Sequence, residues 1–73
     1  MAELTVRAEF AGIVLSVSVE AGRVVEADQE LLVIESMKTE IPVGSPKAGR
    51  VTGIRVSEGQ TVEERQPLVV LET

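Results

Sequence analysis

The sequence repeats itself at an offset of 37 residues. The offset matches turn glycines with turn glycines and strand residues with strand residues: Ala11-Gly12 with Ala48-Gly49, Val14 with Val51, Val19 with Val56, Gly22 with Gly59, Val25-Glu26 with Val62-Glu63, Gln29 with Gln66, and Leu31, Val33 and Glu35 with Leu68, Val70 and Glu72. The match runs without a gap from Val6 and Val43 to the C-terminus. A unit this short cannot cover its own apolar face, so the copies must pack together. We therefore predict a single domain over residues 1–73, with two halves related by a quasi-two-fold axis.

Both copies have the pattern of β-structure. Val17-Ser18-Val19-Glu20 and Ile54-Arg55-Val56-Ser57 alternate apolar and polar residues, which is typical of half-buried strands. The runs Leu31–Ile34 and Leu68–Leu71 are bounded by turn-forming or charged residues, and we interpret them as fully buried strands. No window shows the apolar stripe of a helix. The sequence thus predicts an all-β fold, a flattened eight-strand barrel or sandwich.

The composition excludes most enzyme chemistry. The chain has no His and no Cys, so it lacks an imidazole acid or base, a thiolate nucleophile and the N/S ligands of a zinc site. A net charge of −5 argues against nucleic-acid binding, which needs Lys and Arg to neutralise phosphates. The longest apolar runs are far too short to span a membrane. We expect a cytoplasmic module without an active site of its own, and a monomer as an isolated domain.

Nothing in the chain matches Met37-Lys38 on the C-terminal side, because Ser36 aligns with the last residue, Thr73, while Thr39 aligns with Ala2. These two residues therefore link the copies, and two residues suit a tight hairpin. The resulting register makes four predicted pairs: Ser36 with Thr39, Glu35 with Glu40, Ile34 with Ile41, and Leu32 with Val43. It places the apolar members on one face, as a core-facing side requires.

The composition of this loop is unfavourable for the turn it must make. A primed two-residue turn holds its central residues at positive φ, where Asn-Gly or Asp-Gly is preferred. Met37-Lys38 costs on the order of 1–2 kcal/mol there. Glu35 directly opposite Glu40 adds a repulsion of about a few tenths of a kcal/mol. A strained, exposed turn is a candidate functional site.

The other candidate residues have simpler interpretations. Lys47, the only other lysine, lies in a loop and is interpreted as a solubilising charge. Gly22 and Gly59 are hairpin glycines, because neither belongs to a phosphate-loop pattern. Without a buried pocket around them, Glu35 and Glu40 are expected to steer a partner rather than act as an acid/base pair. Met37 offers an apolar side chain that a partner could grip.

The segment Glu35-Ser36-Met37-Lys38-Thr39-Glu40-Ile41-Pro42-Val43 resembles the modification site of the biotin/lipoyl attachment domain family. The resemblance is greatest to small biotin/lipoyl attachment proteins and biotin carboxyl carrier domains, and it extends from about Val6 to Glu72. It implies that a biotin protein ligase joins biotin to the side-chain nitrogen of Lys38, with Met37, Thr39 and Glu35 contributing to ligase recognition. It also implies partners, a biotin carboxylase and a carboxyltransferase of an acyl-CoA-type carboxylase, between which the domain carries a carboxyl group.

Two features at the turn separate the cofactors that the family uses. Biotinyl domains usually show Met-Lys-Met, and here Thr39 follows Lys38. Lipoyl domains usually show Asp-Lys-Ala, so Met37 favours biotin. The inserted thumb of some carboxylase carriers has no counterpart between Gly22 and Leu31. Two alternatives stay open: a lipoyl carrier of a 2-oxoacid dehydrogenase-type system, and an unmodified β-barrel interaction module.

Overall fold

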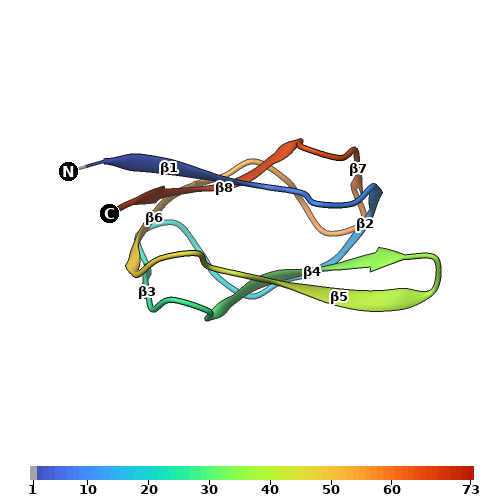
Figure 1. Ribbon diagram of the computed structural model, residues 1–73, viewed down its shortest axis with the longest axis horizontal. Helices are drawn as coiled ribbons and strands as arrows, with labels where there is room; N and C mark the ends of the chain where they lie inside the picture. The colour runs from blue at the N-terminus through green and yellow to red at the C-terminus, as the bar shows by residue number, and fades with distance from the viewer. Residues whose placement is uncertain (1) are drawn as a thin grey trace.

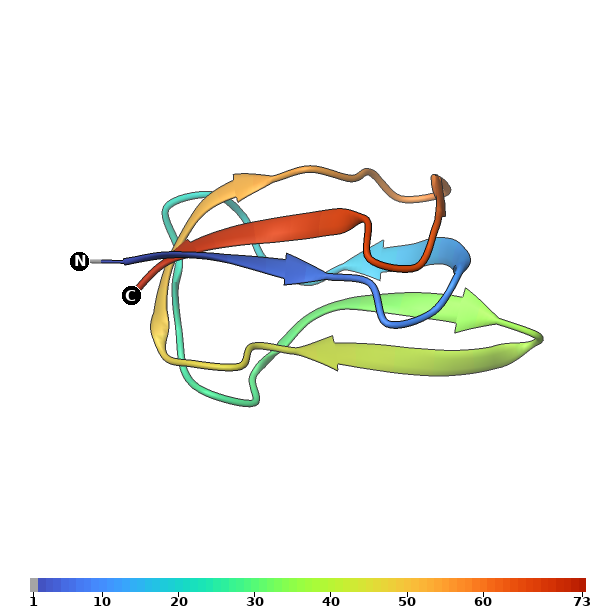
Figure 2. The ribbon, with the colours of Figure 1, turned by 45° about the horizontal axis from the view of Figure 1, so that its top comes forward.

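Two four-stranded antiparallel sheets face each other in the computed structural model, which describes residues 2–73. The strands, in chain order, are β1 (Glu3–Arg7), β2 (Gly12–Val17), β3 (Val24–Val25), β4 (Glu30–Ser36), β5 (Thr39–Gly44), β6 (Gly49–Ile54), β7 (Thr61–Val62) and β8 (Pro67–Glu72). One sheet has the order β1-β8-β6-β3, and the other has the order β5-β4-β2-β7 (Figures 1 and 2). The predicted all-β, eight-strand fold is confirmed, in its sandwich form.

The predicted repeat is also confirmed, down to the backbone conformation. Strand β6 begins and ends 37 residues after β2, and β7 begins and ends 37 residues after β3. The left-handed residues outside the Met37-Lys38 turn follow the same offset, since Gly22 corresponds to Gly59 and Asp28 to Arg65. Each sheet takes its two central strands from one copy and its two edge strands from the other. Neither copy could form a complete sheet alone.

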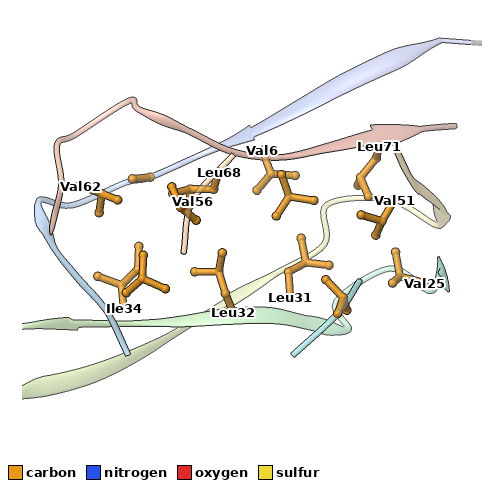
Figure 3. Packing of buried hydrophobic residues seen from close by; sticks show 14 residues of the cluster. Val6, Val25, Leu31, Leu32, Ile34, Val51, Val56, Val62, Leu68 and Leu71 are labelled. Carbon is orange, nitrogen blue, oxygen red and sulfur yellow. The ribbon is translucent and has the colours of Figure 1, made fainter. Parts of the chain in front are cut away.

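The core lies between the sheets and draws on both copies. Buried aliphatic side chains fill it, including Leu31, Leu32, Leu68 and Leu71, which have no exposed surface (Figure 3). Burying a side chain of this kind contributes roughly 1.5–3 kcal/mol relative to leaving it in water. This packed aliphatic core holds the two sheets together and supports the turns at their ends.

Two details of the strand predictions were wrong. The strands β2 and β6 end at Val17 and Ile54, earlier than the alternating pattern indicated, because the chain then leaves the ladder for the glycine turns. Val19 and Val56 nevertheless stay buried in these connections. The run Leu31–Ile34 is not buried throughout, since Val33 pairs with Ser16 and Pro42 on the outer side of its sheet and is half-buried.

The sandwich measures 36 × 17 × 17 Å, so it has two distant ends. The β4–β5 turn lies at one end, and both termini and the β5–β6 connection lie at the other (Figure 1). Among residues 2–73, no helix is long and apolar enough to cross a membrane.

Candidate functional site

The β4–β5 hairpin has the register that the sequence predicted. Ser36 pairs with Thr39, Glu35 with Glu40, Ile34 with Ile41 and Leu32 with Val43. Ile34 is buried at the base of the hairpin, in the core region that also contains Val62 (Figure 3). The paired ladder and this anchor fix where the tip of the hairpin lies.

The turn itself is held in a left-handed conformation. Met37 has φ 53° and Lys38 has φ 65°, so both central residues have positive φ, as a primed turn requires. Neither residue is a glycine, and the pair stores strain on the order of 1–2 kcal/mol. The conformation persists because the ladder on each side over-determines it.

The side chains of the turn point into solvent. Met37 is 94% exposed, and Lys38 and Thr39 are exposed beside it. Glu35 is half-buried and Glu40 is exposed one pair before the turn. The structure thus brings all four predicted site residues, Glu35, Met37, Lys38 and Thr39, to one tip. The side chain of Lys38 is thus exposed at this tip.

Lys47 has a different setting. It lies in the connection between β5 and β6, at the end of the sandwich away from the hairpin (Figure 1). Its carbonyl accepts a hydrogen bond from the hydroxyl of the buried Ser45 at 2.6 Å. The two lysines are therefore at opposite ends of the molecule, and only Lys38 occupies a hairpin tip.

A shallow groove of about 430 Å³ lies at the base of the turn. Its lining comes from three strands and includes Ile13, Glu35, Lys38 and Thr61. Strand β2 approaches the hairpin closely here, since a Cβ on Gly12 would collide with the Glu35 carbonyl and the Ile34 side chain. Glycine at this position lets β2 support the hairpin base directly.

Sequence reasoning missed the exposed apolar residues beside this tip. Phe10 is 51% exposed and Ile13 is 45% exposed, and both line hollows that also include Met37. Single exposed hydrophobes are common, so neither residue stood out alone. The repeat offered a signal, because the residues that match them in the second copy are Lys47 and Arg50.

The fold, the hairpin and its lysine agree with a comparison against protein families. A family model described as "Biotin-requiring enzyme" matches residues 5–71. The chain belongs to the biotin/lipoyl attachment domain family. Domains of this family are carriers, which bring a covalently attached group to the active sites of a larger enzyme. No match was found among curated proteins.

Two solved structures similar to this biotin/lipoyl domain are carboxylases. One is a single-chain, multi-domain long-chain acyl-CoA carboxylase, with 36% identity and a TM-score of 0.89 over 97% of this chain. Another is the Kluyveromyces lactis urea carboxylase, with 30% identity and a TM-score of 0.92 over 99% of this chain. The chain spans only 7% and 6% of those two proteins. It therefore corresponds to one small part of each.

Proposed function

We propose that this biotin/lipoyl domain is a biotin carboxyl carrier, with biotin joined to Nζ of Lys38 by an amide bond. The observation that carries the proposal is the strained, exposed turn that presents Lys38 at the tip of a rigid hairpin. The similarity to two carboxylases favours biotin over lipoate. Met37, immediately before the lysine, favours it as well.

The residues at the tip fit a group attached in this way. The side chain of Lys38 leaves the fold at a fixed point, while its four methylene groups can rotate in solvent. The ladder between β4 and β5 holds that point in place, so that motion is confined to the arm. Met37, Thr39 and Glu35 lie around the amine, where a biotin protein ligase would contact them. Biotin, once attached, supplies a ring nitrogen that accepts and releases a carboxyl group.

The chain's own contribution is to position the arm and carry it between enzymes. We propose that it serves an ATP-dependent biotin carboxylase and a carboxyltransferase, and that it has no active site of its own. Tethering raises the effective concentration of the attached ring at each partner. The small acidic body, with a net charge of −5, suits brief docking steered by basic surfaces.

Intact mass and peptide mapping of the chain from its native cells test this proposal. We expect one biotin increment, located on Lys38, and none on Lys47. Lys38→Arg should abolish labelling by a biotin protein ligase, while the matched control Lys47→Arg should be labelled at the wild-type rate. A lipoyl increment on Lys38, or an unmodified chain in cells with active ligase, would contradict the proposal.

A further inference from the structure

The two sheets are quasi-equivalent, but their outer surfaces differ in chemistry. On the β5-β4-β2-β7 sheet the outward side chains include four apolar ones, which we call the apolar face: Ile13, Leu15, Val33 and Pro42. Ile13 and Leu15 are 45% and 40% exposed. Shifting these four positions by 37 residues gives the matching positions on the other sheet, which hold Arg50, Thr52, Val70 and Thr5.

The second sheet shows what the fold needs at these positions. Arg50 and Thr52 occupy the same backbone setting as Ile13 and Leu15, so the fold does not require apolar residues there. The one apolar residue of the matching set, Val70, is only 6% exposed, and its carbonyl accepts a hydrogen bond from Thr52 at 3.3 Å. An exposed apolar cluster that the fold does not need is typical of a contact surface.

The charges on the two faces differ in the same way. Strands β5, β4, β2 and β7 carry Glu30, Glu35 and Glu40 and contain no Lys or Arg. Near the turn, Glu35 lies between Glu40 and Ile13 in the ladder, so two carboxylates are opposed without a cation in their row. On the other sheet the corresponding neighbour of Glu72 is Arg50. The apolar face therefore leaves carboxylates that a partner's cations can neutralise.

We infer that the apolar face, with Glu35 and Glu40 beside it, docks on the biotin carboxylase, on an apolar area bordered by Lys and Arg. This inference rests on the proposed function. An enzyme that binds ATP surrounds its site with positive potential to hold the phosphates, and such a surface attracts this face. A second copy of the chain placed on the same face would instead oppose carboxylates with carboxylates.

The position of the face also suits delivery of the arm. The row of Ile13, Glu35 and Glu40 is one residue pair from the turn, so docking there holds Lys38 at the margin of the contact. The groove at the base of the turn, lined by Ile13, Glu35 and Thr61, is open to receive a partner side chain. A contact confined to this face involves few residues, as suits a carrier that must leave one enzyme for the next.

The repeat supplies substitutions that the fold already accepts. The double change Ile13→Arg and Leu15→Thr installs the residues found at the equivalent positions of the second copy. The double change Glu35→Gln and Glu40→Gln removes the opposed carboxylates. Its matched control is Glu3→Gln with Glu72→Gln, which removes the equivalent opposed pair from the other sheet. Thermal unfolding establishes that each variant is folded.

The binding assay uses the unmodified Lys38→Arg chain, so that it does not depend on attachment, and biotin carboxylase purified from the cells that make this chain. We expect both apolar-face variants to raise Kd about tenfold and the matched control to change it less than about twofold. With a biotinylated chain that retains Lys38, the double change Ile13→Arg and Leu15→Thr should raise KM in carrier-dependent ATP hydrolysis and leave kcat unchanged.

Three results would overturn the docking surface. The first is an unchanged Kd for the apolar-face variants, and the second is an equal rise in Kd for the two glutamine double variants. The third is a wild-type dimer in sedimentation that the double change at Ile13 and Leu15 dissociates. A wild-type chain that lacks biotin on Lys38 would instead refute the proposed function. The mass of the wild-type chain thus separates the two failures.

Discussion

Replacing Met37-Lys38 by Asn-Gly should make the protein more stable while removing the proposed attachment site. Both residues have positive φ, 53° and 65°, and strain on the order of 1–2 kcal/mol is stored in the pair. Asn and Gly adopt this conformation readily in a primed turn. The added glycine offsets about 0.5 kcal/mol of the relief, because it frees the unfolded chain. The expected net gain is about 1 kcal/mol in the free energy of unfolding.

Thermal and urea unfolding measure this gain. For a domain of this size, about 1 kcal/mol corresponds to an increase in Tm of roughly 4–8 °C. As a matched control, each of the two lysines is replaced by glycine in a separate variant. Lys38→Gly should be stabilising or neutral, whereas Lys47→Gly should lose about 0.5–1 kcal/mol, because Lys47 does not have positive φ.

The sign of the change decides the result. A lower Tm for the Asn-Gly variant, or a larger loss for Lys38→Gly than for Lys47→Gly, would refute the primed turn and the hairpin register derived from it.

Two further predictions concern the hairpin. Gly12→Ala should lower the free energy of unfolding by about 1–3 kcal/mol, because the added Cβ would collide with the Glu35 carbonyl. The control in thermal unfolding is Gly53→Ala, whose added Cβ would lie 3.8 Å from its nearest neighbour. Equal effects of the two substitutions would contradict the close approach of β2. Thr39→Met, which restores the usual biotinyl flank, should speed ligase labelling of Lys38 in a time course, and an unchanged rate would show that Thr is fully accepted there.

The hairpin register could be predicted from the sequence because the repeat locates its own boundary. Once Met37 and Lys38 are recognised as the link between the two copies, the length of the loop and the period of two leave one pairing that buries Ile34 and Leu32 together. The position of Lys38 at the tip follows from the same reasoning, whereas its role as an attachment site was implied by the family resemblance. The attachment itself remains a prediction.

The faces of the sandwich were harder to predict. A register shift between Val14 and Ser16 leaves Leu15 as an extra residue in β2, and an apolar run carries no mark of such a bulge. For the same reason the run Leu31–Ile34 did not show that Val33 points outward. The exposed Ile13 would have been found by comparing each residue with its repeat mate, rather than by searching for motifs.

The pairing of the chain ends has a consequence for where such a protein can carry a group. Ala2 and Thr73 exchange both backbone hydrogen bonds, at 3.1 and 2.8 Å, in the position that matches Thr39 and Ser36 across the quasi-two-fold axis. The scaffold therefore offers two geometrically interchangeable tips. A circular permutant could join Thr73 to Ala2 through a Met-Lys dipeptide and open the chain at the original turn. The lysine would then lie at the opposite end of the sandwich, on the ladder that Ala2 and Thr73 already form.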